Sequence, residues 1–520
     1  MLHGDPVYSL SLAWYYCIMD YAGMKVLIMG LGLHGGGLES ARWMMKRGAD
    51  ITVTDLRDEQ TLAPSIEQLE AACPGFGWVS VRYVLGKHEI NDFKNADIVI
   101  KNPGVRPDSP FLQAARRIET DISLFLRGID GVRLTAVTGS KGKSSTASAL
   151  HWVLAHSGGK GKAYLGGNIT VSPLAFVDDL RPGDDVVLEL SSWQLGDLRG
   201  RCDANGRPLL KPKAAVLTPI MPDHLDRYGS MEAYVADKRV IYQGQDSGDF
   251  TIAGDDDWGR SFLAESKAAP LVYSAAPLPE GVGGLAGGGW IEGPDGPGLA
   301  RLHGDEKPVE LVPAQPLVPG RHQKQNLLAA GLALLGLGLP PDTISEGLGS
   351  FPGIEHRLER FHEAGGVTFY NDSAATIPEA AAAALEALGD TNCNTLSNTF
   401  GNTQSNTSGS GRLILVTGGT DKNLDFSPLV NAVRQAQTVN LSAVILLAGT
   451  GSDKLRGLLA DAGITSLGPY DRLDSAVAAA LEAAAPGDCV LLSPGCASFG
   501  MFLNEFDRGR KWKETVKRLA

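Results

Sequence analysis

Short apolar runs alternate along the chain with longer segments in which apolar residues recur at helical spacing. This alternation is typical of α/β proteins, because each buried strand is followed by a helix that packs on the sheet. The runs that predict strands cover residues 26–29, 51–54, 98–100, 132–137, 186–190, 214–218, 367–370, 413–417, 443–448 and 489–493. We therefore predict parallel sheets covered by helices.

The chain is long enough for several domains, since its 520 residues exceed what one core can organise. We place α/β domains at residues 24–130, 131–352 and 353–520. Residues 1–23 precede the first predicted strand, and we interpret them as an extension without an assigned role. Residues 391–411 are rich in Asn, Thr, Ser and Gly, which predicts a mobile surface loop inside the third domain.

The most informative segment joins a predicted strand to a predicted helix at 146–154. It reads Thr138-Gly139-Ser140-Lys141-Gly142-Lys143-Ser144-Ser145-Thr146. Glycines allow backbone N–H groups to face phosphate oxygens, while the lysine neutralises terminal phosphates and the hydroxyl binds Mg²⁺. The segment therefore predicts ATP binding, with Lys143 and Ser144 in these roles. Its spacing is shorter than G-x-x-x-x-G-K-[ST], which points away from GTPases and motor ATPases.

A second glycine turn, Gly30-Leu31-Gly32, follows the first predicted strand, and Asp55 follows the second. This arrangement is typical of nucleotide-binding domains, in which the acidic residue meets a ribose or base. Glycine turns also serve plain strand-to-helix packing, so this alternative stays open. The loop Asn102-Pro103-Gly104 ends a later strand, where open α/β sheets bind ligands.

Three residues of the second domain are candidate metal ligands. Glu189 lies inside an apolar run, where a carboxylate needs a metal or an ion pair, and the nearby phosphate loop favours Mg²⁺. His224 follows Pro222-Asp223 and is either a ligand or an ordinary hydrogen-bonded loop residue. Lys238 is interpreted, on local sequence alone, as a solvated helix lysine.

Two loops of the third domain are candidates for binding an anionic substrate. Lys422 follows Gly418-Gly419-Thr420-Asp421 at a strand's carboxyl end, where it meets an anion or forms a surface turn. Asp372 ends another strand and either binds an amine or phosphate or caps the following helix.

Composition and charge narrow the set of expected partners and cellular locations. Lys plus Arg number 47 and Asp plus Glu 59, a net charge of −12, so nucleic acid is not an expected partner. Six cysteines without C-x-x-C spacing fit a reducing cytoplasm. No apolar run reaches the length of a membrane span, and no Lys or Arg precedes the apolar residues 7–19, so neither a membrane nor a signal peptide is expected.

Besides the phosphate loop, short motifs run through all three domains in order. They are Gly30-Leu31-Gly32, Asn102-Pro103-Gly104, Asp121-Ile122-Ser123-Leu124-Phe125, Gly166-Gly167-Asn168-Ile169, Glu189-Leu190-Ser191-Ser192, Asp223-His224-Leu225-Asp226-Arg227, Gly320-Arg321-His322, Asn326, His356-Arg357, Asn371-Asp372-Ser373, Gly418-Gly419-Thr420-Asp421-Lys422 and Ser493-Pro494-Gly495-Cys496-Ala497-Ser498. The ordered set resembles the Mur ligase family of peptidoglycan synthesis, in its glutamate-adding branch, over about residues 24–520. The resemblance implies three α/β domains: Rossmann-like and UDP-binding, phosphate-loop and ATP-binding, and a Rossmann-like C-terminal domain.

The resemblance also implies roles for individual residues. The UDP substrate would be bound by Gly30, Leu31, Gly32, Asp55, Asn102, Pro103, Gly104 and Asn168. ATP would be bound by Gly139, Ser140, Lys141, Gly142, Lys143, Ser144, Ser145, Asn326 (at the adenine), Arg357 and Asp372. Mg²⁺, as two ions, would be held by Ser144, Glu189, His224 and Lys238, the last as a carbamate, and glutamate by Thr376, Lys422 and Ser498. Lys143, Glu189, His224 and Lys238 would be the catalytic residues.

The implied substrates are UDP-N-acetylmuramoyl-L-alanine, D-glutamate and ATP, used by a monomer in the cytoplasm. ATP would phosphorylate the alanyl carboxylate, and the glutamate amine would then displace phosphate. Because water destroys an acyl phosphate, the third domain is expected to close over the site first.

Three positions depart from the family pattern. Ala374 stands where a lysine usually follows Asn371-Asp372-Ser373, and Gln323 replaces an asparagine. Glu505 stands where an aromatic residue usually follows Asn504. Ala374 and Glu505 lie in the part that selects the amino acid, so L-glutamate remains an alternative to D-glutamate.

Other functions stay open at this stage. A folylpolyglutamate-type ligase shares the second and third domains, but generally lacks a UDP-binding domain such as 25–130. A nucleotide-binding regulator would not need Glu189, His224 or Lys238. A redox enzyme would bind NAD at the first glycine turn.

Overall fold

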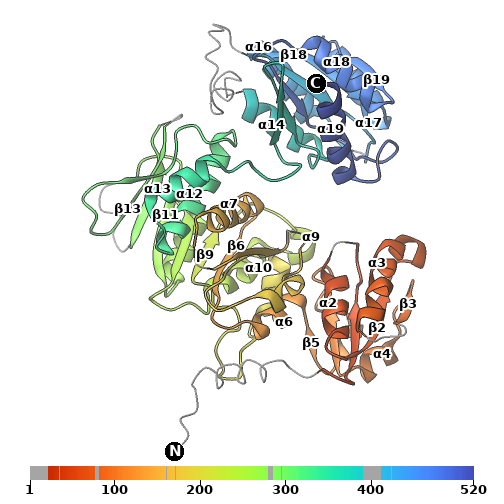
Figure 1. Cartoon of the computed structure of the whole chain (residues 1–520), viewed down its shortest axis with the longest axis vertical. Helices are drawn as coiled ribbons and strands as arrows, with labels where there is room; N and C mark the ends of the chain where they lie inside the picture. The colour runs from red at the N-terminus through yellow and green to blue at the C-terminus, as the bar shows by residue number, and fades with distance from the viewer. Residues whose placement is uncertain are drawn as a thin grey trace, which may run out of the picture.

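The computed structural model describes residues 21–33, 35–76, 81–159, 161–169, 171–278, 285–293, 296–389, 411–422 and 424–520. Three β-sheets follow one another along the chain, each with its own helices (Figure 1). Of the expected extension 1–23, residues 1–20 lie outside the described residues, and so do residues 391–410 of the expected mobile loop 391–411.

The first sheet is parallel and has the strand order β3-β2-β1-β4-β5, which is the Rossmann order. Its strands are β1 (Lys25–Met29), β2 (Asp50–Asp55), β3 (Arg82–Leu85), β4 (Ile98–Lys101) and β5 (Ile118–Glu119). Its helices are α2 (Gly36–Met45), α3 (Glu59–Ala72), α4 (Ile90–Asn95), α5 (Pro110–Gln113) and α6 (Asp121–Gly128). The strand order reverses between β1 and β4, so their carboxyl ends flank a crevice.

The second sheet has nine strands in the order β14-β13-β12-β11-β10-β9-β6-β8-β7, and only β13 and β14 run antiparallel to their neighbours. Its strands are β6 (Arg133–Thr138), β7 (Ala163–Gly167), β8 (Asp185–Glu189), β9 (Ala214–Leu217), β10 (Phe250–Gly254), β11 (Ala269–Ser274), β12 (Gly287–Ile291), β13 (Gly298–Leu302) and β14 (Val309–Val312). Strand β6 lies between β8 and β9, so the phosphate loop, Glu189 and the loop to His224 leave one sheet edge together.

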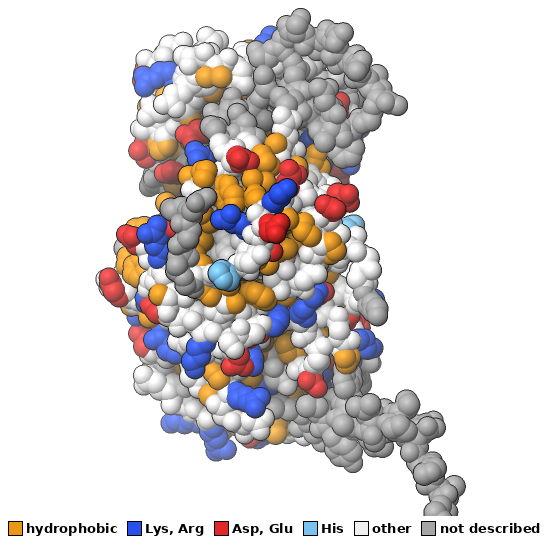
Figure 2. Space-filling model, turned by 90° about the vertical axis from the view of Figure 1, so that its left-hand side faces the viewer, with side chains coloured by type: hydrophobic (Ala, Val, Ile, Leu, Met, Phe, Trp, Pro, Cys, Tyr) orange, Lys and Arg blue, Asp and Glu red, His pale blue; other side chains and the backbone are white. Residues whose placement is uncertain are grey.

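Helices cover this sheet and share its apolar core. They are α7 (Lys143–His156), α8 (Ser192–Leu198), α9 (Leu225–Tyr228), α10 (Met231–Lys238), α11 (Asp257–Glu265), α12 (Arg321–Gly336) and α13 (Pro341–Gly349). Buried residues of α7 and α12 pack with those of the strands in one cluster, which includes Leu150, Leu328 and Val187. The side of the molecule on which β13 lies mixes hydrophobic side chains with charges of both signs (Figure 1 and Figure 2).

The third sheet has the order β15-β16-β20-β17-β18-β19, with β15 antiparallel to β16 and the other pairs parallel. Its strands are β15 (Glu359–Ala364), β16 (Val367–Asn371), β17 (Leu413–Thr417), β18 (Leu441–Leu447), β19 (Leu467–Tyr470) and β20 (Cys489–Leu492). Its helices are α14 (Pro378–Gly389), α16 (Ser427–Val439), α17 (Thr450–Asp461), α18 (Leu473–Ala483) and α19 (Glu505–Leu519).

The predicted fold class is confirmed, because three α/β sheets are present and each predicted strand overlaps an observed one. One helix differs: α7 begins at Lys143 rather than at Thr146. Gly142, with φ +87°, ends the loop and lets the helix start at once. Within the described residues, no helix combines the length and apolarity that crossing a membrane requires.

Candidate active site

The phosphate loop leaves no room for side chains at its two glycines. A Cβ at Gly139 would lie 1.9 Å from Thr218 Oγ1, and one at Gly142 would lie 2.3 Å from Asn326 Oδ1. Both glycines also have positive φ, +147° and +87°. The loop therefore exposes backbone N–H groups at the N-terminus of α7, where an anion is favoured.

Ser140 ties the phosphate loop to the segment that leads to His224. Its Oγ lies 2.9 Å from both the backbone N and O of Met221 and 2.9 Å from Tyr234 Oη. Its backbone N–H donates to Pro219 O at 2.9 Å. These bonds fix the phosphate loop relative to the neighbouring loop after β9.

Glu189 ends β8 with a carboxylate that the protein satisfies only in part. The residue is 1% exposed, and its Oε1 accepts a hydrogen bond of 2.9 Å from Asn168 Nδ2. Among the described residues, no group donates to its buried Oε2. An unpaired buried carboxylate oxygen is costly unless a cation binds it, so the donor set fits Mg²⁺.

His224 lies at the start of α9 in the left-handed region, with φ +53°. Its side chain is partly exposed, and its ring centroid lies 5.0 Å from that of Trp193 on α8. The imidazole therefore packs against the Trp193 ring while remaining accessible to a ligand.

The interpretation of Lys238 as a solvated lysine is wrong. The residue is 1% exposed, because α10 packs its last turn against the phosphate loop, and its Nζ donates to Gly139 O at 2.8 Å. Burial, together with the charge of Lys143, lowers the pKa of Lys238 to about 7. Much of this amine is neutral near pH 7, and the neutral form is the one that reacts with carbon dioxide to give a carbamate.

The other predicted ATP residues border the same loop from two domains. Lys143 Nζ donates to Ser140 O at 3.1 Å, and burial lowers its pKa, with a smaller contribution from the charge of Arg357. Asn326 donates from Nδ2 to Gln323 Oε1 at 3.2 Å, which gives the unusual Gln323 a partner. Arg357, from the segment that enters the third domain, is exposed, and its charge helps to lower the pKa of Lys143.

Asp372 does not cap a helix as one alternative supposed, since α14 begins later, at Pro378. Its Oδ1 accepts from Leu358 N at 3.1 Å, and its Oδ2 lies 2.6 Å from Ser493 Oγ. Burial raises the pKa of Asp372 to about 7. The residue therefore fastens the loop after β16 to the loop after β20.

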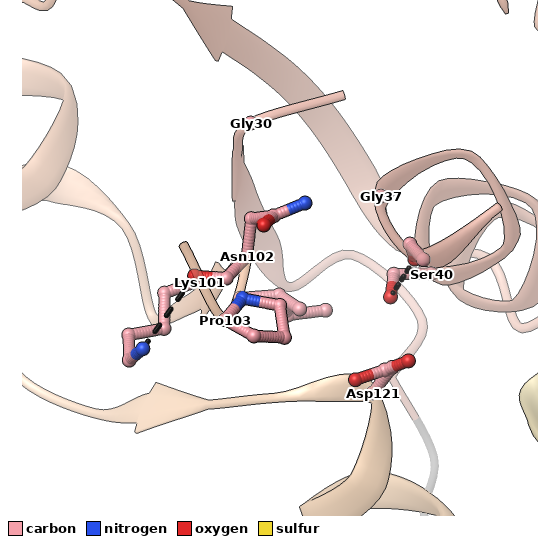
Figure 3. Close-up of a pocket in the computed structure, with 9 residues that line it drawn as sticks. Gly30, Gly37, Ser40, Lys101, Asn102, Pro103 and Asp121 are labelled. Atoms are coloured by element: carbon pink, nitrogen blue, oxygen red, sulfur yellow. Dashed lines mark hydrogen bonds between the residues drawn. The ribbon is translucent and has the colours of Figure 1, made fainter. Parts of the chain in front are cut away.

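The first glycine turn faces the loop after β4. A Cβ at Gly30 would lie 2.9 Å from Asn102 Cβ, so the two segments are in contact (Figure 3). Asp55 accepts from the N–H of Gly32 at 3.3 Å and is 4% exposed, while Leu31 is fully buried. Asn102 Oδ1 accepts from Gly104 N at 3.0 Å, which shapes the turn around Pro103.

The three predicted glutamate residues lie on loops that bond to one another. Thr420 and Ala497 exchange backbone hydrogen bonds of 3.0 and 3.1 Å, which brings the Lys422 loop beside Ser498. Gly495 N donates to Ala375 O at 2.9 Å, which brings in the segment before Thr376. Lys422 is exposed, with its Nζ 5.8 Å from the Phe499 ring, whereas Ser498 is 4% exposed.

Arg508 on α19 is a buried cation beside the predicted glutamate loops, and sequence reasoning missed it. Its guanidinium is buried and donates to Ser373 Oγ, Ser373 O and Cys496 O at 3.0, 2.9 and 3.1 Å. It thereby places a cation beside Ala374, where the family usually has a lysine. Its place in an ordinary amphipathic helix gave no local signal.

Fold and site together define a class of protein: three α/β units in succession, with a glycine-rich loop of the phosphate-binding type between β6 and α7 of the central unit. Residues 24–123 match the MurD-like N-terminal domain of Mur ligases, 137–334 the Mur ligase middle domain and 356–496 the Mur ligase glutamate ligase domain. The chain belongs to the Mur ligase family, whose members are ATP-dependent ligases.

The sequences of curated relatives match this chain along nearly their whole length. The chain is 39% identical to the UDP-N-acetylmuramoylalanine--D-glutamate ligase of Treponema pallidum, covering 95% of this chain and 98% of that protein. It is 37% identical to the protein of the same name from Roseiflexus sp., covering 96% and 99%.

Solved structures share the fold. They include the UDP-N-acetylmuramate-alanine ligase MurC of Thermotoga maritima, with TM-score 0.55, 18% identity and coverage of 96% of this chain and 100% of that one. MurF of Acinetobacter baumannii has TM-score 0.53, 16% identity and coverage of 95% and 93%.

Proposed function

We propose that this protein joins D-glutamate to UDP-N-acetylmuramoyl-L-alanine at the expense of ATP, in the synthesis of peptidoglycan precursors. The observation that carries the proposal is the buried, half-satisfied carboxylate of Glu189 beside a phosphate loop and a lysine of pKa about 7. The names of the curated relatives supply the substrates. We further propose that the protein acts as a monomer in the cytoplasm.

The first step would transfer the γ-phosphoryl group of ATP. A carboxylate oxygen of the alanyl group attacks the γ-phosphorus, and the bond to the bridging oxygen of ADP breaks, giving an acyl phosphate. The N–H groups of the loop from Lys141 to Ser144 and the ammonium of Lys143 would hold the phosphates and offset the charge that gathers on the transferred group.

Ser144, Glu189, His224 and carbamylated Lys238 would hold Mg²⁺, as two ions. When bound, Mg²⁺ supplies Lewis-acid stabilisation of the phosphoryl oxygens. The pKa of Lys238 matters here, since a protonated amine repels a cation whereas a carbamate offers it oxygen.

The second step would form the amide bond. The glutamate nitrogen attacks the acyl carbon, phosphate leaves with the bridging oxygen, and the nitrogen loses a proton. Thr376, Lys422 and Ser498 would hold the glutamate carboxylates, while Asn326, Arg357 and Asp372 would bind ATP from the central and third domains. Closure of the third domain would exclude water from the acyl phosphate.

The test measures phosphate release from ATP with UDP-N-acetylmuramoyl-L-alanine, adding D-glutamate or L-glutamate separately. Release that requires both the UDP substrate and D-glutamate supports the proposal. Release only with L-glutamate keeps the ligase and overturns the stereochemistry, which would assign weight to Ala374 and Glu505. The absence of release with either amino acid overturns the proposal.

A further inference from the structure

A buried ion pair joins the first domain to the second beside the loop assigned to the UDP substrate. Lys101 is the last residue of β4, and its Nζ lies 2.6 Å from Asp197 Oδ2 on α8. The two side chains are 3% and 5% exposed. Lys101 directly precedes the Asn102-Pro103-Gly104 motif, and no motif included Asp197.

The ammonium of Lys101 also lies against its own loop. Its Nζ donates to Val105 O at 3.1 Å. It also makes a longer contact of 3.5 Å with Asn102 O, which Figure 3 draws as a dashed line. The ammonium therefore lies between two carbonyls of its own loop and a carboxylate of the central domain. Lys101 thus joins the Asn102–Val105 turn to α8.

The central domain contacts the same turn a second time. Arg227 Nη1 lies 3.4 Å from Gly104 O, and its guanidinium lies 4.2 Å from the Trp193 ring centroid. Trp193 in turn contacts His224. The UDP loop and the candidate metal ligand therefore share neighbours on α8 and α9.

Because both side chains are buried, the charged form of each residue depends on the charge of the other. Desolvation lowers the pKa of Lys101 and raises the pKa of Asp197, while each charge opposes the shift of the other. A buried charge that loses its partner is strongly unfavourable, whereas an apolar pair of similar volume is tolerated. A role in stability alone could therefore be filled by two apolar side chains, but bonds to the loop carbonyls could not.

We propose that Lys101 and Asp197 are positioning residues for the UDP substrate, an inference that rests on the proposed function. Helix α8 begins three residues after Glu189, so the pair sets the Asn102–Val105 turn relative to the phosphate-transfer site. The pair acts through the turn and touches no reacting atom.

The test compares Lys101→Met, Lys101→Arg and the double variant Lys101→Met/Asp197→Leu with the unaltered protein. For each we measure thermal unfolding, kcat, and KM for UDP-N-acetylmuramoyl-L-alanine and for ATP. Lys101→Met should raise the KM for the UDP substrate about tenfold and change the KM for ATP by less than about twofold. Lys101→Arg should recover part of the loss.

The double variant separates positioning from stability. It should regain thermal stability relative to Lys101→Met while its KM for the UDP substrate stays high. Recovery of both together would overturn the inference. If Lys101→Met fails to fold, the double variant and Lys101→Arg decide the question by the same KM comparison.

A control breaks another ion pair between the same domains, whose side chains are more exposed. Asp178 accepts from Lys46 Nζ and Arg47 Nη2 at 2.7 and 2.5 Å, away from the UDP loop. Asp178→Asn should lower thermal stability and leave both KM values unchanged. If the unaltered protein binds no UDP-N-acetylmuramoyl-L-alanine, the proposed function and this inference fall together; if it binds and Lys101→Met binds equally well, only the inference is wrong.

Discussion

The central-domain site and the third-domain site satisfy their buried polar groups in opposite ways. In the central domain, Glu189 Oε2 is buried without a donor among the described residues, and Lys238 is buried with a depressed pKa. In the third domain, Asp372 accepts hydrogen bonds from Ser493 and Leu358. Arg508 likewise donates hydrogen bonds to Ser373 and Cys496.

The difference indicates where ligands are needed. The central site has buried polar groups without partners, which are unfavourable in the free protein and become favourable when a cation and phosphates bind. In the third domain, the buried polar groups bond to one another, and we call them the frame. The more exposed side chains Lys422 and Thr376 form what we call the rim. We therefore expect central substitutions to abolish chemistry and rim substitutions to weaken the binding of the amino acid.

Replacing the unpaired carboxylate should have the largest effect. Glu189→Gln keeps the shape and the contact to Asn168 but removes the charge, and we expect kcat to fall by about a thousandfold. Steady-state phosphate release measures this, and circular dichroism checks the fold. A fall of less than about tenfold would mean that the half-satisfied carboxylate is not a ligand.

Lys238 should have the second-largest effect on activity, and the activity should depend on pH through this residue. Its pKa is lowered to about 7, so the amine becomes protonated, and carbamate formation is suppressed, as the pH falls below about 7. We expect activity to fall over that range and to recover partly with added bicarbonate.

Lys238→Ala should lose about a hundredfold or more in kcat. A small carboxylate such as acetate should restore part of the loss by supplying a metal ligand oxygen. If Lys238→Arg, which keeps a cation, retains full activity, the carbamate hypothesis is wrong.

At the rim, Lys422→Met should raise the KM for glutamate about tenfold, because one charge-assisted contact to a carboxylate is lost. The KM values for ATP and the UDP substrate should change little. Lys517→Met is the control, since Lys517 is an exposed lysine in the last turn of α19. Equal effects on all three KM values would remove Lys422 from the amino-acid site.

Measured without ATP, Asp372 should give the smallest effect, which is an effect on stability. Burial raises its pKa to about 7, so the folded state binds a proton that the unfolded state releases near pH 4. This contribution to the free energy of unfolding is full below about pH 4 and is lost as the pH rises to about 7, at up to about 1.4 kcal/mol per pH unit.

Asp372→Asn should flatten that part of the stability profile of the third domain. Urea unfolding between pH 4.5 and 7.5 measures it, and Asp474→Asn on the exposed start of α18 is the control. An unchanged slope in Asp372→Asn would show that the frame does not hold this proton.

The sequence predicted what depends on neighbours along the chain. Apolar runs located the strands, and glycine spacing located the phosphate loop, because both are local patterns. Lys238 could not be interpreted locally, since its burial arises where α10 meets Gly139, far away in sequence. The Lys101–Asp197 pair and the contact of Arg508 with Ser373 likewise form only when separate elements pack together.

The most direct test of the account follows an oxygen atom. UDP-N-acetylmuramoyl-L-alanine labelled with ¹⁸O in both alanyl carboxylate oxygens is incubated with ATP, D-glutamate and the protein, and the released phosphate is analysed by mass spectrometry. The account predicts one ¹⁸O in each phosphate, since the carboxylate oxygen bridges carbon and phosphorus in the acyl phosphate. Unlabelled phosphate released during amide formation would contradict it.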